Sequence, residues 1–422
     1  MLNTTALLTD RYELTMLQAA RNAGTANRKC VFEVFTRHLP AGRRYGVVAG
    51  TGRVLEQIQN FRFDNSTLDW LVAEKIVDAE TADWLKDYKF TGNISGYREG
   101  ELYFAHSPVL TVEATFAEAV LLETLILSIL NYDSAVASAA SRMATAANGR
   151  FLAEMGSRRV NENSAVVAAR AAYVAGFDAS SNLEAGRSWG VPTMGTAAHA
   201  FTLLHDTEDQ AFKAQLKTFG EKTTLLVDTF DIEAGVRNAI ALAPNLGAVR
   251  IDSGDLGVEV KRVRQLLDSL GARETKITVT NDLDEFAIAA LAASPVDSYG
   301  VGTSVATGSG SSTAGFVYKL VSHQDDNGNW VDVAKTSAMK TNPGGKKFAA
   351  RTATEELVDN EPIHEGRNLI VELVLNGNPL SEFCGTTGVQ NAREHHRKAK
   401  AELPTAGLRL MRGDAALQTV IR

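Results

Sequence analysis

The chain has 422 residues, of which 45% are hydrophobic and 22% are charged, and its formal net charge is −7. A chain of this length is too long to fold around one small hydrophobic core, so we expect one large domain and a second unit. The net negative charge argues against a general binder of nucleic acid or of membrane surfaces. The two cysteines, Cys30 and Cys384, are too few for a disulfide framework or a zinc site.

Neither the start of the chain nor its longest apolar stretch is typical of an exported or membrane protein. The start, MLNTTALLTDRYELTMLQAA, has an acidic residue within its apolar part and lacks the basic beginning of a signal peptide. The longest apolar stretch, 117–130, contains Glu118 and Glu123 and is therefore not a membrane span. We expect a cytoplasmic protein with reduced cysteines, and neither nucleic acid nor membrane as a partner.

The first part of the chain mixes helices and strands irregularly. Leu14, Leu17 and Ala20 predict one apolar face of a helix that is capped by Thr9 or Asp10 and ends at Gly24. A strand-like VFEVFTR follows at 31–37, and aromatic-rich helices alternate with strands without a fixed order up to residue 116. Residues 1–116 therefore predict an α+β unit, and the Ala- and Leu-rich residues 117–150 a helical connection.

From residue 151 the pattern changes to repeated strand and helix. The apolar segments that end in polar residues or glycine are FLAEMGSRR, YVAGFDASSN, VPTMGTAAH, TTLLVDTFD, GAVRIDSGD, TKITVTND and DSYGVGTS. Helical stretches separate them, and Asp282 with Glu285 predicts a capping box at the start of one helix. Such alternation predicts a parallel sheet that is covered on both faces. Its number of units favours an irregular parallel α/β barrel, with an open doubly wound sheet as the alternative.

The end of the chain returns to a less regular pattern. Residues 305–347 are rich in Gly, Ser and Thr and then basic, and 350–422 again mix strand and helix fragments. We expect this part to complete the first domain. The predicted domains are a discontinuous α+β domain of 1–130 and about 340–422, and an α/β barrel of 131–339. The run HHRKAK at 395–400 is interpreted as a solvated helix face, since two adjacent histidines alone are no metal site.

Polar residues and glycines follow nearly every predicted barrel strand. They are Arg158, Arg159, Ser180, Ser181, Asn182, His199, Asp228, Asp231, Arg250, Asp252, Asp255, Asn281, Asp282, Gly300, Gly302, Thr303 and Ser304. The carboxyl ends of parallel strands meet at one edge, where ligands bind in such folds. Cations and glycine turns suit phosphates, and carboxylates suit ribose hydroxyls and Mg²⁺ through water. An isolated member is more often a helix cap, but the joint pattern indicates a sugar phosphate site.

Four features have a plain alternative to a functional role. His199 follows a strand and is equally consistent with a satisfied core or surface residue or with a base or nucleophile. Arg158 and Arg159 are also typical of a solvated loop, and Tyr12 of an apolar anchor for the first helix. The segment KTNPGGKK at 340–347 is equally consistent with a surface turn and with a mobile loop that closes over phosphates.

Taken together, these residues resemble the nicotinate phosphoribosyltransferase family over nearly the whole chain. The matching strings, in the family's order, are TDRYELTM, FEVFTRHLP, GSRR, GFDASSN, GTAAHAF, VDTFDI, RIDSGDL, TNDLDE, YGVGTS, YKLV and KTSAMKTNPGGKK. The resemblance implies a type II phosphoribosyltransferase with an irregular α/β barrel and a second domain made from both chain ends. It also implies a homodimer with shared active sites.

The reaction implied by the resemblance joins nicotinate and phosphoribosyl pyrophosphate into nicotinate mononucleotide and pyrophosphate. It is coupled to ATP hydrolysis, which places such an enzyme among carbon–nitrogen ligases, and it belongs to NAD salvage. ATP is the co-substrate and Mg²⁺ the cofactor. The ion would be held through the phosphates, with Asp252 or Asp255 reaching it through water and no residue as a direct ligand.

The resemblance also implies roles for individual residues. His199 would be phosphorylated by ATP, with Asp228 orienting its ring, and Arg250 would lie against the pyridine ring and its carboxylate. Arg158 would contact a phosphate or carboxylate, and Asp252 a ribose hydroxyl. Tyr12 would stack on the base that is bound in the other subunit. The 5′-phosphate would be held by Asn281, Asp282, Gly302 and Thr303, and pyrophosphate or the phosphates of ATP by Lys335, Lys340 and Lys346.

Two positions bear on the choice of base. Nicotinamide-specific relatives place an aspartate where this chain has Ser181, and a hydroxyl donates to a carboxylate that an aspartate would repel, so nicotinate is favoured. Those relatives stack a phenylalanine on the ring where this chain has Met155. The alternatives are a nicotinamide or quinolinate phosphoribosyltransferase, or a non-catalytic phosphate-binding barrel. The presence of His199, Asp228, Arg250 and Asp252 argues for catalysis.

Overall fold

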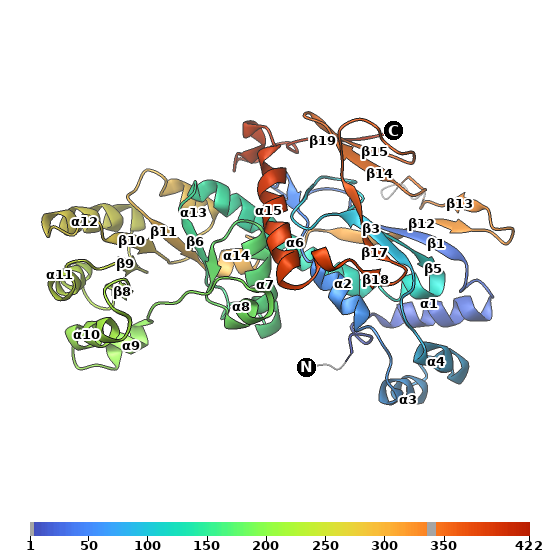
Figure 1. Ribbon diagram of the computed structural model, residues 1–422, viewed down its shortest axis with the longest axis horizontal. Helices are drawn as coiled ribbons and strands as arrows, with labels where there is room; N and C mark the ends of the chain where they lie inside the picture. The colour runs from blue at the N-terminus through green and yellow to red at the C-terminus, as the bar shows by residue number, and fades with distance from the viewer. Residues whose placement is uncertain (1–3, 336–342) are drawn as a thin grey trace. The chain divides into compact units, whose positions relative to one another are not determined.

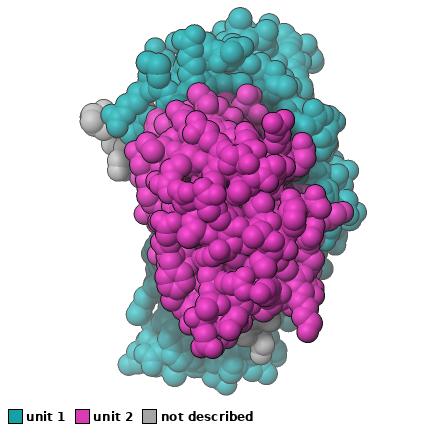
Figure 2. All heavy atoms as spheres, turned by 90° about the vertical axis from the view of Figure 1, so that its left-hand side faces the viewer, with its two compact units in different colours: residues 1–138, 311–422 teal, residues 139–310 magenta. Residues whose placement is uncertain are grey.

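The computed structural model describes residues 4–335 and 343–422. The chain divides into two compact units, coloured separately in Figure 2. Unit 1 consists of Met1–Ser138 and Ser311–Arg422, and unit 2 of Ala139–Gly310. Unit 1 is therefore made from both chain ends, and each unit is described by itself below.

Unit 1 is organised on a sheet whose strands all pair antiparallel. Its order is β13 (Trp330–Asp332), β12 (Phe316–Gln324), β1 (Lys29–Thr36), β5 (Leu110–Thr115), β3 (Asn93–Tyr97), β17 (Ile370–Leu375) and β18 (Asn378–Pro379). The central strand β1 is buried along almost its whole length, which requires cover on both faces. Sequence-distant segments thus share one sheet (Figure 1).

The return of the chain to unit 1 comes earlier than the predicted position near residue 340. Strand β12 pairs with β1 from Thr36↔Phe316 to Cys30↔His323, so residues from 316 onward belong to the sheet of unit 1. Residues 316–335 are therefore not part of the barrel domain, to which the boundary 131–339 assigned them. The segment itself gave no signal, because which strand pairs with which depends on contacts far apart in the chain.

The remaining elements of unit 1 surround this sheet. A second sheet has the order β16 (Arg367–Asn368), β14 (Phe348–Arg351), β15 (Glu355–Asp359) and β19 (Gln418–Ile421), and β2 (Gly46–Val47) pairs with β4 (Leu102–Tyr103). The helices are α1 (Arg11–Asn22), α2 (Thr51–Gln59), α3 (Asn65–Ala73), α4 (Ala79–Lys86), α5 (Phe116–Val120) and α15 (Gly385–Ala401), with 3₁₀ turns η1 (Ser381–Phe383) and η2 (Thr405–Leu408). The long helix α6 (Glu123–Ala147) contains the first boundary between the units.

Helix α1 confirms the prediction for the start of the chain. Leu14, Leu17 and Ala20 are buried on one face, Asp10 occupies the N-cap position, and the helix ends at Asn22. Thr9 donates its hydroxyl hydrogen to the carboxylate of Glu13, which is itself fully buried.

The interpretation of the run 395–400 as a solvated face holds for Arg397 and Lys398, which are exposed, but is wrong for the two histidines. His396 is 3% exposed and its Nδ1 lies 2.9 Å from the carbonyl oxygen of Gly100, while His395 Nε2 lies 2.8 Å from Glu101 Oε2. Burial lowers the pKa of His396 to about 4 and that of Lys400 to about 8. This face of α15 therefore packs inward, against the segment around Gly100 and Glu101.

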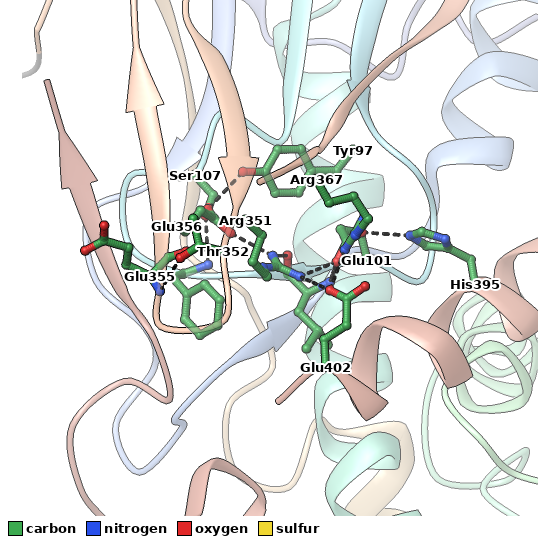
Figure 3. Close-up of polar contacts among 12 residues, drawn as sticks. Tyr97, Glu101, Ser107, Arg351, Thr352, Glu355, Glu356, Arg367, His395 and Glu402 are labelled. Atoms are coloured by element: carbon green, nitrogen blue, oxygen red, sulfur yellow. Dashed lines mark hydrogen bonds and ion pairs between the residues drawn. The ribbon is translucent and has the colours of Figure 1, made fainter. Parts of the chain in front are cut away.

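Glu101 belongs to a buried network of charges in unit 1, shown in Figure 3. The guanidinium of Arg351 donates to Glu101, to the carbonyl of Leu102 at 2.7 Å and to Glu356 Oε2 at 2.7 Å. The side chains of Glu101, Arg351 and Glu356 are each at most 1% exposed. Glu356 also accepts a bond from Tyr97 Oη at 2.8 Å. The network joins β14, β15 and α15 to residues 97–102.

Unit 2 confirms the predicted parallel sheet with covered faces. The strand order is β7 (Ala179–Ser180), β6 (Phe151–Glu154), β11 (Ser298–Val301), β10 (Lys276–Val279), β9 (Ala248–Ile251) and β8 (Thr224–Leu226), with every pair parallel. Its helices are α7 (Glu162–Val174), α8 (Leu183–Trp189), α9 (His199–Leu203), α10 (Glu208–Phe219), α11 (Ile232–Leu242), α12 (Leu256–Ser269), α13 (Glu285–Ala290) and α14 (Thr303–Ala306).

The sheet of unit 2 is curled into an incomplete barrel (Figure 1). Of the seven predicted strand segments, VPTMG contributes only one parallel bridge, between Thr193 and Ser180. Pro192 lacks the N–H that a continuing ladder requires, so this segment does not extend into a strand. The irregular barrel predicted from the sequence is thus a curled sheet that does not close between β7 and β8. Among helices in residues 4–335 and 343–422, none is both long and apolar enough to cross a bilayer.

Candidate functional site

The strand ends of unit 2 enclose a cavity of about 150 Å³. Its walls come from the residues that follow β6, β9 and β10 and from the end of β11. They are Met155, Arg158, Arg159, Arg250, Asp252, Thr280, Asn281, Asp282, Gly300, Gly302 and Thr303. The structure therefore brings together nine of the strand-end residues that predicted the site, namely Arg158, Arg159, Arg250, Asp252, Asn281, Asp282, Gly300, Gly302 and Thr303.

Arg250 and Asp252 form the charged centre of this cavity. Arg250 Nη2 lies 3.3 Å from Asp252 Oδ2, and its Nε donates to Thr280 Oγ1 at 3.1 Å. The hydroxyl of Thr280 in turn donates to Asp252 Oδ1. Arg250 Nη1 donates to Thr196 Oγ1 at 3.0 Å and to the carbonyl of Ala197 at 3.2 Å. The guanidinium plane is thereby fixed from three sides, which is what a group stacked on a planar ligand requires.

Asp228 and His199 lie beside this centre, although neither lines the cavity. Asp228 Oδ1 lies 3.1 Å from His199 Nε2, and Asp228 Oδ2 accepts the backbone N–H of Asp252 and the hydroxyl of Ser253, both at 2.7 Å. The side chain of Asp228 is fully buried, whereas that of His199 is 40% exposed. The carboxylate therefore links the imidazole to the loop after β9 and fixes which ring nitrogen faces the protein.

Asn281 and Asp282 adopt unusual backbone angles. Their φ values are +92° and +46°, a region that non-glycine residues enter at a cost. The predicted capping box with Asp282 is wrong, because Asp284 occupies the N-cap of α13 and accepts the N–H groups of Phe286 and Ala287. Asp282 is thus left to line the cavity instead.

Met155 reaches the cavity because Gly300 has no side chain. A Cβ atom at Gly300 would lie 2.7 Å from the Met155 sulfur and 2.6 Å from Thr280 Cγ2, and both are impossible approaches. The thioether therefore forms part of the cavity wall, between the strand ends.

The remaining predicted residues lie elsewhere. Ser181 follows β7, is exposed and does not line the cavity. Tyr12, Lys335 and Lys346 belong to unit 1, and Lys340 lies outside the described residues. Lys335 is exposed, whereas Lys346 Nζ pairs with Glu113 Oε1 at 2.7 Å. Burial and nearby Glu123 raise the pKa of the Tyr12 phenol to about 12.

The charges of the cavity favour an anion on one side. Arg158 and Arg159 are exposed, and in the described parts of the chain neither forms an ion pair, so their charges face solvent at the cavity wall. No group of three His, Cys, Asp or Glu side chains that could hold a metal ion is found in residues 4–335 and 343–422.

Three hydroxyl residues were missed by the sequence analysis: Thr280, Ser253 and Thr196. Each bonds directly to Arg250, Asp252 or Asp228. Their signal was present in the strings TVTND, RIDSGD and GTAAH, where a hydroxyl residue lies within three positions of a predicted site residue. The sequence does not reveal which of many such hydroxyls turn toward the charges.

Comparisons with known proteins show the family of the chain. A family model described as the N-terminal domain of nicotinate phosphoribosyltransferase (NAPRTase) matches residues 7–131. The nicotinate phosphoribosyltransferase pncB1 of Mycobacterium tuberculosis is 53% identical, over 98% of this chain and 94% of that protein. The chain belongs to the nicotinate phosphoribosyltransferase family. The resemblance predicted from the motifs is thereby confirmed.

Two further relatives of the family extend the comparison. The nicotinate phosphoribosyltransferase of Bacillus subtilis is 37% identical, over 81% of this chain and 72% of that protein. The crystal structure of human nicotinic acid phosphoribosyltransferase covers 98% of this chain and 97% of its own, with a TM-score of 0.83 at 24% identity. That likeness confirms the fold class, an α/β barrel-like unit with a second α+β unit.

Proposed function

We propose that this member of the family transfers the phosphoribosyl group of phosphoribosyl pyrophosphate to nicotinate, in NAD salvage in the cytoplasm. The ring nitrogen forms a bond to the anomeric carbon while the bond to pyrophosphate breaks, which gives nicotinate mononucleotide and pyrophosphate. The observation that carries the proposal is the cavity in which Arg250, Asp252, Asn281, Asp282 and Thr303 converge. Such a displacement needs positioning and charge stabilisation more than a strong acid or base.

Each wall of the cavity suits one part of the substrates. Arg250 is held flat by its three partners and suits the pyridine ring and its carboxylate, in a cavity that the Met155 thioether also lines. Asp252 suits a ribose hydroxyl. The exposed Arg158 suits a carboxylate or phosphate. Asn281, Asp282, Gly302 and Thr303 would form the cradle of the 5′-phosphate, with the backbone N–H groups of the turn after β11 as donors.

ATP hydrolysis would be coupled through His199. Because Asp228 holds Nε2 of this imidazole, the nitrogen that receives the γ-phosphoryl group would be Nδ1. The terminal phosphoanhydride bond of ATP breaks, a phosphorus–nitrogen bond forms, and water later cleaves that bond to release phosphate. The 40% exposure of the His199 side chain leaves access for both reactants.

The acidic side chains fit a Mg²⁺ ion that is carried by the substrate. Asp255 caps α12 with Oδ1, and its Oδ2 forms no hydrogen bond in the described parts of the chain. Asp255 would therefore reach the ion through water more readily than Asp252, whose two oxygens bind Thr280 and Arg250. When bound, the ion would neutralise charge on the leaving pyrophosphate.

The choice of nicotinate over nicotinamide would depend on Ser181. Its backbone N–H donates to the carbonyl of Glu154 at 2.8 Å, and its exposed hydroxyl is available to donate to a carboxylate. A phosphate role is better supported for Lys335 than for Lys346, because Lys346 already pairs with Glu113. An exposed lysine gives up less free energy when it binds a new anion than a lysine that must first break an ion pair.

The test compares turnover of nicotinate and nicotinamide with phosphoribosyl pyrophosphate, with and without MgATP. The expected result is mononucleotide formation from nicotinate that ATP stimulates, with ADP released. His199→Ala should abolish ADP release while slow phosphoribosyl transfer remains. The matched control is His205→Ala, since His205 bonds to the carbonyl of Phe201 and should leave both activities unchanged. A phosphorylated protein whose phosphoryl group is on Nε2 would contradict the assigned role of Asp228.

Shared active sites in a homodimer are a further part of the proposal. Tyr12 is 44% and Met16 36% exposed on α1, and such apolar exposure suits an interface. The test mixes Tyr12→Ala and His199→Ala subunits. If each site takes Tyr12 from one chain and His199 from the other, the mixed dimer holds one intact site and recovers activity. No recovery on mixing would show that both residues come from the same chain.

A further inference from the structure

Glu154 is a buried carboxyl group that the mechanism above does not use. It is the last residue of β6 (Figure 1) and is 1% exposed. Its Oε1 accepts the N–H of Gly156 in the turn after β6, and its Oε2 accepts the hydroxyl of Ser180 at 2.6 Å. Ser180 ends β7, the neighbouring strand. One carboxyl group therefore holds the ends of two adjacent strands.

The bonds continue into the two loops and close a ring. The hydroxyl of Ser180 accepts the N–H of Asn182 at 2.9 Å, and Asn182 Nδ2 donates to Ser157 Oγ at 3.0 Å. Ser157 precedes Arg158, and Asn182 follows Ser181. The ring thus fixes the backbone on both sides of the gap between Arg158 and Ser181.

The close approach within this ring depends on Gly156. A Cβ atom at Gly156 would lie 2.8 Å from Glu154 Oε1 and 2.9 Å from the carbonyl oxygen of Gly302. Any side chain there would push the carboxyl away from the N–H that it accepts. The turn after β6 therefore has the one residue type that lets Glu154 reach it.

All of these partners of Glu154 are neutral donors. Burial raises the pKa of its carboxyl, while the bonds from Ser180 and Gly156 act in the opposite direction. A buried carboxyl group that has no cation beside it is costly compared with an apolar side chain. The cost has a structural reason if the carboxyl group fixes the positions of the two loops, because hydrogen bonds are directional and apolar contacts are not.

We propose that Glu154 is a positioning residue that sets the separation of Arg158 and Ser181 for recognition of the substrate's pyridine carboxylate. The inference rests on the proposed function, in which Ser181 donates to that carboxylate, and it takes the carboxylate rather than a phosphate as the partner of Arg158. Glu154 itself touches no substrate, because it is buried and both of its carboxyl oxygens are bonded within the protein, whereas Ser181 is exposed. Its effect should therefore be confined to the base, and the phosphoribosyl pyrophosphate contacts after β9, β10 and β11 should be unaffected.

The test measures nicotinate affinity by calorimetry and the KM of each substrate in Glu154→Ala, Ser180→Ala and Glu154→Gln. Glu154→Ala should weaken nicotinate binding about tenfold and narrow the preference over nicotinamide by a similar factor. The KM of phosphoribosyl pyrophosphate should change by less than about twofold. Ser180→Ala cuts one of the two links and should give a smaller shift in the same direction. Glu154→Gln should recover most of the affinity, because its amide accepts from Gly156 and donates to Ser180.

The matched control is Glu184→Gln, an exposed carboxyl on α8 that pairs with Arg187 and should leave all values unchanged. Equal loss of affinity for both substrates, or no loss for nicotinate, would overturn the proposal. If Glu154→Ala does not fold, Ser180→Ala and Glu154→Gln decide by the same criteria. Absence of turnover in the unaltered protein would refute the proposed function, and the nicotinate affinities would still decide the role of Glu154.

Discussion

Two clusters of charge, one in each unit, use the same side chains in opposite ways. In unit 1, Glu101, Arg351 and Glu356 are at most 1% exposed, and they bind one another (Figure 3). In unit 2, Arg250 and Asp252 also bind each other, but their side chains are 12% and 24% exposed and line a cavity. Both clusters fix planar groups with several hydrogen bonds. Of these two clusters, the second lines a cavity.

The difference shows how burial separates a structural cluster from a site. A fully buried pair must neutralise itself, because leaving one charge without a partner in the interior costs several kcal/mol. A pair that is partly exposed has water on one side and can exchange that water for a ligand. We therefore expect substitutions in the first cluster to change the free energy of unfolding and substitutions in the second to change turnover.

The largest effect is expected for Arg351→Ala. It leaves Glu101 and Glu356 buried without this guanidinium group, which should lower the free energy of unfolding by about 3–5 kcal/mol. Urea unfolding followed by circular dichroism measures this change. Arg237→Ala, which removes an exposed pair with Glu233, is the control and should cost less than about 0.5 kcal/mol. If Arg351→Ala were as mild as the control, burial would not be what distinguishes the two clusters.

Glu13 extends this comparison to a second buried carboxyl group of unit 1. Among the described residues its hydrogen-bond partners are neutral, whereas those of Glu101 include cations. Glu13 accepts from the N–H and the hydroxyl of Thr124 and from the hydroxyl of Thr9, and burial raises its pKa to about 7. Burial also opposes ionisation of Glu101, but the bond from His395 and the guanidinium groups of Arg351 and Arg367 hold its pKa well below the usual range. Two buried carboxyls of one unit thus shift in opposite directions.

The raised pKa of Glu13 has a definite consequence for stability. The protonated carboxyl group of Glu13 stabilises the folded state fully at pH values below 4.5, which is its pKa in the unfolded chain. This stabilisation is lost as the pH rises through about 7. Over this window the loss is on the order of 3 kcal/mol. Glu13→Gln should flatten the dependence of the unfolding free energy on pH between 4.5 and 7, measured by urea titration at several pH values. An unchanged slope would assign the dependence to other groups.

Asp228→Asn tests the second cluster. The amide oxygen still accepts from the N–H of Asp252, but the carboxylate that faces His199 Nε2 is lost, which removes the group that fixes its tautomer. The ATP-dependent rate should fall by about 100-fold or more, and the free energy of unfolding by less than about 1 kcal/mol. Asp231→Asn, on the same loop, is the control because an asparagine caps α11 equally well. A large loss of stability in Asp228→Asn would place this residue with Glu101 as a structural charge.

What the sequence predicted well was local. The strand ends of unit 2 were assigned from apolar runs that stop at polar residues, and nine of the residues named there line one cavity. The start of α1 and the parallel sheet follow from short-range periodicity and capping. Residues such as Arg250 and Asp252 come together because parallel strands end at one edge, which requires no knowledge of distant pairing.

What it did not predict depends on long-range contacts. The pairing of β12 with β1 moved the domain boundary, and the contact of His395 and His396 with residues 100–101 turned an apparently solvated face inward. The N-cap at Asp284 in place of Asp282 reflects two positive φ values that no sequence pattern signals. Hydroxyl partners such as Thr280 were also missed. A threonine that follows a strand gives no indication of which charged group its hydroxyl will bond.

Thr280 offers the smallest and most selective test of the comparison. Its hydroxyl donates to Asp252 and accepts from Arg250 Nε, so Thr280→Val removes one bond from each charge without changing the size of the side chain. Arg250 still has Thr196 and Ala197 as partners, so the loss should be partial: about tenfold in kcat/KM for nicotinate. Thr280→Ser should restore most of it.

The control for this substitution is Thr278→Val, two residues earlier on β10, where the hydroxyl bonds to Ser298 Oγ at 2.7 Å and does not line the cavity. Both valine variants remove a buried hydroxyl and should cost similar stability, about 1 kcal/mol. Only Thr280→Val should change turnover, because only its hydroxyl joins two charges that face the ligand. If both variants lost stability and neither lost activity, the charges of Arg250 and Asp252 would be held by the protein as firmly as those of Glu101 and Arg351. The distinction between the two clusters would then rest on exposure alone.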